Sequence, residues 1–288
     1  MVYMEKLHIQ FNTDALSATF WRSLQHQLDV MKLLKLGCGL VTPEQYLNEH
    51  GFMDFSPAAN LRLDHAAAHE GAADWLLSGL LRDSIEATGL FLDECLNLCG
   101  LISLGSGPVA SLTLHDVLER QPMRNHKAYI PDKLRRLRSE FDVSSDLEDH
   151  LLSLNKTRSC IVHRLGFVMA GKDDIDDGAL VVRLIGFEMT IRDTLTGETV
   201  PLAPNHFARN ASELLGRISE RRFSFVAGQQ VKIPAEDLPS IIVTLWKFSC
   251  DIVESIKRFG RSKGIPVTTV LGETAPDELT PAIVSNSE

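Results

Sequence analysis

The chain has 288 residues, of which 44% are hydrophobic and 23% are charged, and its mean hydropathy is close to zero. This composition is typical of a folded globular protein and excludes a chain that is disordered throughout, collagen-like or mucin-like. No apolar run approaches the roughly 20 residues that cross a bilayer, and the start lacks the regions of a signal peptide. We therefore expect a cytoplasmic protein with no membrane partner. The net charge of −9 argues against a protein that coats nucleic acid indiscriminately.

The cysteines and histidines indicate neither a disulfide framework nor a metal site. There are five cysteines, an odd number, without a Cys-x-x-Cys pair, and they lie in apolar stretches as reduced core cysteines do. His65 and His69 stand one helical turn apart, but the pattern lacks a third ligand and the Glu of the zinc-protease motif. We therefore expect no metal and no cofactor.

Helical patterns dominate the first hundred residues. Apolar residues recur at steps of three and four from Asp14 to about Leu36, and Gly37 and Gly39 are expected to end that helix. Residues Thr42–Gln45 read Thr-Pro-Glu-Gln, a capping pattern that predicts a second, short helix. The segment from Glu70 to about Leu104 is apolar on all sides, which is typical of a central buried helix.

The second half of the chain mixes helices with one β region. Helices are predicted from Pro131 to Phe141, over 145–167 and over 234–263. Residues 179–202 contain two β-type runs, and Thr194–Gly197 is typical of a hairpin turn. Short strands are also predicted at Phe223–Val226 and Val231–Ile233. The expected fold class is mainly α, a helical bundle with a small inserted β-hairpin region near 179–233.

The predicted organisation has three parts. Residues 1–69 form N-terminal helices that pack on the bundle, and residues 70–263 form the helical domain with the β insertion. Residues 264–288 carry four acidic residues, three prolines and neither Lys nor Arg, so we expect a disordered acidic tail.

One middle segment is locally basic. Between Arg120 and Arg138 the single acidic residue, Asp132, stands among seven basic ones. These are Arg120, Arg124, Lys127, Lys133, Arg135, Arg136 and Arg138. Such a cluster suits contacts with phosphates, but it is also typical of a solvated helix face that balances acidic neighbours. The sequence leaves both interpretations open.

The helix predicted over 145–167 carries the residues with chemical content. Arg158 occupies a position in its apolar seam, where an unpaired charge costs several kcal/mol (about 3–5) unless it finds a partner. Asn155, Ser159 and His163 follow one another at steps of four and form a polar stripe beside the seam. Arg158 and His163 are separated by about 140° around the helix, so Arg158 must bend if both act on one group.

An arginine and a histidine so placed suit phosphodiester cleavage. Imidazole exchanges protons near neutral pH, and guanidinium holds a phosphate through two hydrogen bonds, so no metal is required. The alternative is structural: Arg158 and His163 pair with carboxylates such as Asp93 or Glu94 of the long central helix and lock the bundle. The spacing alone is compatible with either role.

The segment around this pair resembles a known family. From Arg158 the chain reads Arg-Ser-Cys-Ile-Val-His-Arg-Leu-Gly, which is similar to the Arg-x4–6-His signature of HEPN domains. It looks especially like the branch whose signature helix reads Arg-Asn-Cys-Ile-Val-His, followed by Gly. The resemblance extends over about 70–260, because a long apolar helix, a Pro-led basic helix and a glycine-led strand at Val231–Ile233 that leads into a final helix occur in the same order.

The resemblance implies a HEPN-like helical bundle that forms a homodimer, with two signature helices at a shared cleft. Many members are metal-independent endoribonucleases of toxin–antitoxin, abortive-infection and RNA-processing systems, and others are inactive binding modules. It implies that Arg158 contacts the scissile phosphate and that His163 is the acid–base group. Ser159 departs from the Asn, Asp or His that usually follows this arginine, which puts catalysis in doubt, although its hydroxyl still offers a hydrogen bond.

The sequence supports three functional hypotheses. The leading one is a ribonuclease of a bacterial defence or stress-response system that acts through Arg158, Ser159 and His163, with an antitoxin or regulatory protein as a candidate partner. Further RNA contacts are expected from Arg164, Lys133, Arg135, Arg136 and Arg138. The second hypothesis is a catalytically inactive HEPN-like module that binds RNA, a nucleotide or a protein. The third is a helical scaffold without a nucleic-acid role, which the net charge favours.

Overall fold

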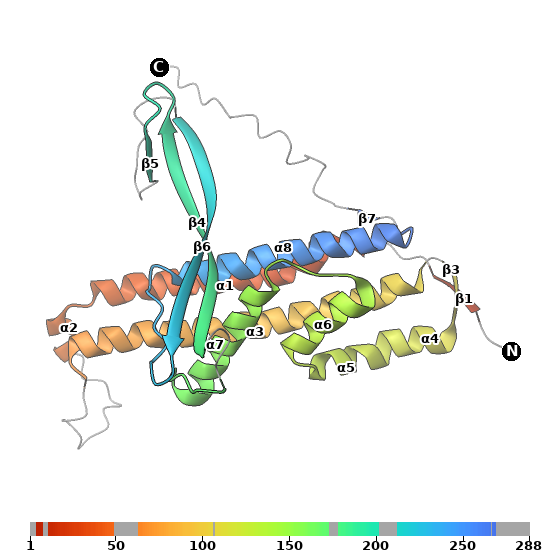
Figure 1. The fold of residues 1–288 in the computed structure, drawn as a ribbon, viewed down its shortest axis with the longest axis horizontal. Helices are drawn as coiled ribbons and strands as arrows, with labels where there is room; N and C mark the ends of the chain where they lie inside the picture. The colour runs from red at the N-terminus through yellow and green to blue at the C-terminus, as the bar shows by residue number, and fades with distance from the viewer. Residues whose placement is uncertain are drawn as a thin grey trace.

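Three long helices form the body of the molecule. The computed structural model describes residues 4–7, 11–48, 63–105, 107–172, 178–201, 212–265 and 267–268. Helices α1 (Thr13–Leu40), α3 (His65–Leu104) and α8 (Leu238–Ser262) lie side by side (Figure 1). The fold is mainly helical with a small antiparallel sheet, as predicted from the sequence.

Shorter helices cover one side of α3. They are α4 (Ser111–His115), a π-helical turn at Asp116–Arg120, α5 (Gln121–Lys127), α6 (Ile130–Phe141) and α7 (Glu148–Arg164). Two minor pairings involve the N-terminal strands: β1 (Met4–Leu7) is antiparallel to β3 (Gly107–Ala110), and β2 (Phe11–Asn12) is parallel to β7 (Val267–Thr268).

The predicted capping pattern forms at the start of α2 (Pro43–Asn48). The backbone N–H of Thr42 donates to Oε1 of Gln45 at 2.8 Å, and the N–H of Gln45 donates to Oγ1 of Thr42 at 3.2 Å. These reciprocal bonds satisfy two backbone donors that a helix start leaves open. The prediction of a second helix at this point is confirmed.

Helix α3 is the central helix that its apolar composition predicted. Phe91 stacks on Phe20 of α1 at a ring-centroid distance of 4.8 Å, and Leu81, Leu92 and Leu96 are fully buried. Among the described helices, α3 is long and apolar enough to cross a membrane, but half of its most apolar stretch is buried in the protein. Core helices of soluble proteins also meet this criterion, so the structure is compatible with a soluble protein and gives no clear sign of a membrane protein.

Helix α1 belongs to the same bundle as the rest of the core. Its Trp21 donates from Nε1 to Oγ of Ser249 on α8 at 2.9 Å, and Phe20 and Leu24 are buried. The helix continues to Leu40, past the two glycines that were expected to end it. A glycine inside a helix costs only about 1 kcal/mol, which the remaining hydrogen bonds of a long helix outweigh.

The β region is larger than the sequence predicted. Strands β4 (Ala179–Asp193) and β6 (Ser212–Val226) pair over their full lengths, from Ala179 with Val226 to Asp193 with Ser212. The short strand β5 (Thr199–Pro201) adds to the other edge of β4. The hairpin projects beyond the helices (Figure 1). The turn expected at 194–197 is confirmed, because it joins β4 to β5.

The first half of β4 is fixed to the helices by hydroxyl groups. The backbone N–H of Arg183 donates to Oγ of Ser153 on α7 at 3.1 Å. Two residues later, the N–H of Ile185 donates to Oγ1 of Thr244 on α8 at 2.8 Å. The hydroxyls thus take the place of a neighbouring strand, because buried backbone donors require acceptors. This arrangement sets β4 directly beside α7.

One predicted strand is longer in the structure, and another predicted strand does not form. The strand predicted at Phe223–Val226 is only the end of β6, which starts at Ser212. Val231–Ile233 forms no strand; Gln230, just before it, makes an isolated bridge with Phe167. Val231 and Ile233 are apolar because they fill the core, where they are 3% and 7% exposed.

The predicted acidic tail lies mostly outside the described residues. At its start, Ile265 is buried in the core, so ordered packing extends past the end of α8. Val267 and Thr268 pair with β2. The rest of the predicted tail, 269–288, lies outside the described residues.

Candidate functional site

Helix α7 carries the candidate residues, and its start is held by neighbouring helices. Oγ of Ser145 accepts from the backbone N–H of Leu147 at 3.1 Å and donates to Asp251 of α8 at 3.1 Å. Glu148, in the first turn, pairs with Arg138 of α6. A carboxylate in the first turn is also stabilised by the helix dipole. The position of α7 is thereby fixed against both α6 and α8.

The inward face of α7 belongs to the core. Leu151, Leu154 and Cys160 are fully buried, and α7 contacts α3, α8 and β4. The hydroxyl of Thr157 donates to the carbonyl of Ser153 at 2.7 Å, so its burial leaves no unsatisfied donor. The side chains of α7 that can contact a ligand therefore lie at the edge of this face and on the outward face.

The glycine of the signature ends α7. Leu165 and Gly166 both adopt positive φ angles, 53° and 82°, and the N–H of Gly166 donates to the carbonyl of Cys160 at 3.3 Å. The carbonyl of Gly166 then accepts from Val231 at 2.9 Å. Left-handed backbone suits glycine and costs other residues roughly 1–2 kcal/mol. The left-handed conformation of Leu165 and Gly166 therefore ends the helix at Arg164, and the bond from Val231 ties this end to the segment after β6.

Arg158 lies at the edge of the buried face and is half-buried. Its Nε atom is buried without a hydrogen-bond partner. Within the described part of the chain, no carboxylate pairs with its guanidinium. The structural alternative assigned Asp93 or Glu94 to this arginine, but Asp93 pairs with Lys133, with Nζ and Oδ1 2.6 Å apart. Arg158 thus presents an unsatisfied positive charge at the side of α7.

His163 and Ser159 lie on the outward face of α7. His163 is exposed, whereas Ser159 and Asn155, one and two turns earlier, are half-buried. The predicted polar stripe is therefore accessible along α7. Arg158 lies about 140° around the helix from His163, and no hydrogen bond joins them within the described residues. One chain does not bring the two groups onto one face.

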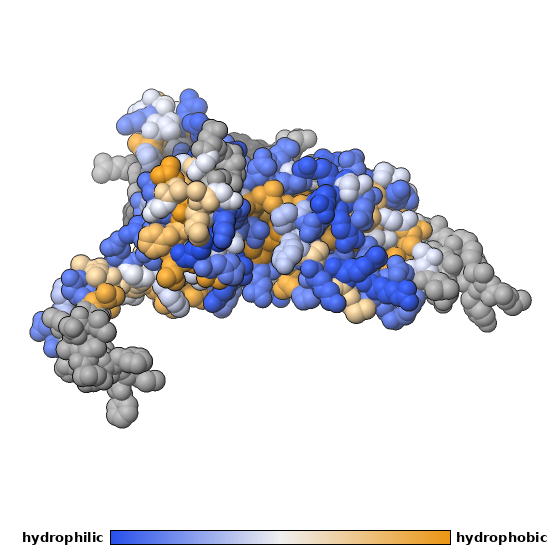
Figure 2. Space-filling view, turned by 60° about the horizontal axis from the view of Figure 1, so that its bottom comes forward, coloured by the Kyte–Doolittle hydropathy of each residue, from blue (hydrophilic) through white to orange (hydrophobic). Residues whose placement is uncertain are grey.

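The four basic residues predicted on α6 all have acidic partners. Lys133 is 4% exposed, and its Nζ also donates to the carbonyl of Gly89 at 3.0 Å. On the surface, Arg135 pairs with Asp132, Arg136 with Glu140 and Arg138 with Glu148. Figure 2 shows that hydrophilic side chains cover much of the surface on this side of the molecule. The prediction that Lys133 contacts RNA does not fit its position, because burial leaves it no surface for a phosphate.

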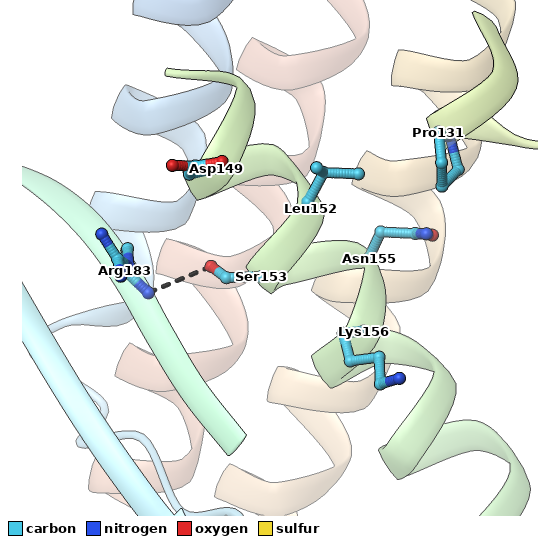
Figure 3. A pocket seen from close by; sticks show the side chains of 7 residues that line it. All are labelled: Pro131, Asp149, Leu152, Ser153, Asn155, Lys156 and Arg183. Carbon is cyan, nitrogen blue, oxygen red and sulfur yellow. Dashed lines mark hydrogen bonds between the residues drawn. The ribbon is translucent and has the colours of Figure 1, made fainter. Parts of the chain in front are cut away.

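A cavity of about 400 Å³ lies over the outward face of α7 (Figure 3). It is lined by Pro131, Asp149, Leu152, Ser153, Asn155, Lys156 and Arg183. Pro131 of α6 stands on one side of α7 and Arg183 of β4 on the other, with Leu152, Asn155 and Lys156 between them. The helical period of α7 predicts Asn155 on this face, whereas Lys156 and Arg183 were not predicted. Lys156 could have been found from its helical position, whereas Arg183 lines the cavity only because β4 packs beside α7.

His150, on the inward face of α7, gives a testable pH dependence. Burial lowers its pKa below the ordinary value of 6.5, and Arg183 acts in the same direction, although Glu220 and Asp149 raise the pKa. As the pH falls, His150 is therefore protonated at a higher pH in the unfolded chain than in the folded protein. The free energy of unfolding consequently falls as the pH drops below about 6.5.

We expect His150→Gln to flatten the loss of stability between pH 7.5 and pH 5.5, as measured by urea unfolding at each pH. His26→Gln, at an exposed position of α1, serves as the matched control and is expected to keep the wild-type slope. An unchanged slope in His150→Gln would contradict the assignment.

Comparisons of the chain with protein-family models, curated proteins and solved structures gave no significant match. Membership of the HEPN family therefore stays a prediction from the signature residues of α7.

Proposed function

We propose that this protein is a HEPN-type, metal-independent endoribonuclease that acts as a homodimer through Arg158 and His163. The observation that carries the proposal is the half-buried guanidinium of Arg158, whose Nε lacks an acceptor and which no carboxylate neutralises within the described residues. Buried or half-buried arginines generally have an anionic partner, because desolvation of an unpaired charge costs several kcal/mol, roughly 3–5. The missing partner is the phosphate of an RNA strand.

The proposed reaction uses the 2′-hydroxyl of the RNA as nucleophile. An imidazole of His163 accepts the 2′-hydroxyl proton as the O2′–P bond forms and the P–O5′ bond breaks. The leaving O5′ takes a proton from a second, protonated imidazole. Arg158 binds the non-bridging phosphate oxygens, whose charge increases in the transition state. The products are a 2′,3′-cyclic phosphate and a free 5′-hydroxyl.

A two-fold dimer supplies what one chain lacks. In-line displacement needs proton-transfer groups on opposite sides of the phosphorus, and in the proposed site each chain supplies one such group, His163. A C2 interface along α7 brings two copies of Arg158 and His163 to one cleft. The exposed position of His163 supports this arrangement, because the side chain is accessible to a second copy.

Ser159 and Arg164 complete the proposed site. Ser159 lies one turn before His163, and its hydroxyl donates or accepts one hydrogen bond at the reacting phosphate. Arg164, which directly follows His163, adds positive charge for a neighbouring phosphate. A bacterial defence or stress-response setting, with an antitoxin or regulatory protein that restrains cleavage in the cytoplasm, fits an activity of this kind.

The test is incubation of the purified protein with total RNA in the presence of EDTA, followed by a denaturing gel and mass analysis of the new ends. We expect cleavage that leaves 2′,3′-cyclic phosphates. The His163→Ala protein is the inactive control and is expected not to cleave. The substitution removes the proton-transfer group from an exposed position, so we expect the melting temperature to be unchanged. Cleavage that EDTA abolishes, or equal cleavage by the His163→Ala protein, would contradict the proposal.

Ser159 favours a second candidate function, a catalytically inactive HEPN-like module that binds RNA. Its hydroxyl offers fewer hydrogen bonds than the amide of the Asn that follows the arginine in the HEPN branch with the signature Arg-Asn-Cys-Ile-Val-His. We expect Ser159→Asn to raise the cleavage rate if Ser159 limits turnover. Binding of RNA without cleavage by either protein would support the binding module.

A further inference from the structure

We infer that the cavity over the outward face of α7 is a nucleotide-binding subsite that holds one nucleotide of the RNA strand beside the cleavage point. The inference deepens the proposed function and rests on it. The cavity volume of about 400 Å³ falls within the range of small-ligand sites, about 300–1,000 Å³. Its lining combines cationic, amide and apolar side chains, which is the mixture that a nucleotide requires.

The cationic side chains of the cavity suit a phosphate. Lys156 and Arg183 line it from α7 and β4 respectively, against the single carboxylate of Asp149. Lys156 is half-buried, and its ammonium makes no hydrogen bond or ion pair within the described part of the chain. It differs in this respect from the basic residues of α6, whose charges are already neutralised. The cavity is therefore a better phosphate site than the basic helix.

The remaining lining residues suit a base. Pro131 and Leu152 offer apolar surface to the face of a ring, and Asn155 offers an amide to its edge. The side chain of Asn155 has no hydrogen-bond partner among the described residues, so both its donor and its acceptor are available. Sequence-specific recognition of RNA uses unpaired bases that are stacked on side chains and hydrogen-bonded at their edges. A base in this cavity would be read by Asn155, with Asp149 as a further acceptor for an exocyclic amino group.

The cavity shares a helix face with the proposed catalytic histidine. Lys156 and His163 are seven residues apart, which places them on nearly the same side of α7 and about 10 Å apart along its axis. Ser159 lies between them. A strand whose scissile phosphate reaches His163 can therefore lay a nearby nucleotide over Asn155 and Lys156. The cavity would then determine which nucleotide flanks the cleavage point.

The experiment measures binding of fluorescein-labelled single-stranded RNA 12-mers of A, C, G or U to proteins that carry His163→Ala, which prevents cleavage. Addition of Lys156→Ala is expected to weaken binding about tenfold. It is also expected to lower the salt slope, which is the steepness with which the logarithm of the binding constant falls with the logarithm of the salt concentration, by about 0.7, the value for one phosphate contact with a single strand. Lys32→Ala, which removes the same charge from an exposed position of α1, is the control and is expected to change neither. Addition of Asn155→Ala is expected to change the ranking of the four oligonucleotides without changing the salt slope.

Equal behaviour of the Lys156→Ala and Lys32→Ala proteins would overturn the inference, as would an unchanged ranking with Asn155→Ala. If free mononucleotides compete for binding as strongly as RNA does, the cavity binds a free nucleotide instead of an RNA strand. That result would also overturn the inference. Because the binding assay requires no turnover, it separates this inference from the proposed function. If the protein cleaves RNA in EDTA and neither Lys156→Ala nor Asn155→Ala changes the cleavage, the proposed nuclease stands and the subsite is rejected. If Lys156 is required for binding but no cleavage occurs, only the nuclease is rejected.

Discussion

Replacement of Arg158 by Ala is expected to lower the rate of RNA cleavage about a thousandfold and to leave the melting temperature unchanged or slightly raised. The loss of rate follows from removal of the group that binds the phosphate charge in the transition state. The stability follows from the lack of a partner: removal of one member of a buried ion pair costs about 3–5 kcal/mol because the other charge is left unpaired. Arg158 leaves no such charge behind within the described residues, and its unsatisfied Nε is removed with it.

Two further substitutions at Arg158 separate charge from shape. Arg158→Met keeps a long side chain without charge or donors, so we expect full stability and the same loss of cleavage as with Ala. Arg158→Lys keeps the charge but loses the planar fork that binds two oxygens, so an intermediate rate is expected. The measurements are single-turnover cleavage and thermal unfolding of each variant. A melting temperature that drops by several degrees in all three variants, with cleavage retained, would assign Arg158 to the structure instead.

The sequence predicts those elements of the fold that depend on neighbouring residues. The bonds between Thr42 and Gln45 span three positions, and the helical period that identifies α3 and α7 is also local. Only the end of strand β6, Phe223–Val226, was predicted, because charged residues obscure the alternation of the rest of the strand. Leu214 and Ile218 share a face with Ile191 and Phe187 of β4 only once the register between the strands is known.

The same distinction applies to the candidate site. The period of α7 predicted that Arg158 lies at the apolar seam, and its half-buried position agrees with this. Its lack of a partner could not be predicted, because it depends on Asp93 being engaged by a residue from another helix. The cavity could not be predicted from the sequence either, because tertiary packing brings Arg183 of β4 and Asn155 of α7 to its lining.

The ion pair between Asp93 and Lys133 is expected to be the most important polar contact for stability. Lys133 is 4% exposed and Asp93 is 8% exposed, and their charged atoms lie 2.6 Å apart between α6 and α3. Asp93→Ala leaves the ammonium of Lys133 buried with the carbonyl of Gly89 as its remaining partner. We expect a loss of about 3–5 kcal/mol in the free energy of unfolding, measured by urea denaturation.

The double variant Asp93→Leu, Lys133→Met tests whether this loss comes from the unpaired charge. Apolar residues of similar size remove both charges together, and such replacements of buried ion pairs are often neutral or stabilising. We therefore expect the double variant to recover most of the stability that Asp93→Ala loses. Its RNA cleavage is expected to equal that of the wild type, because Lys133 has no surface from which to contact a phosphate. Weakened RNA binding in this stable double variant would instead return Lys133 to the RNA surface on which the sequence placed it.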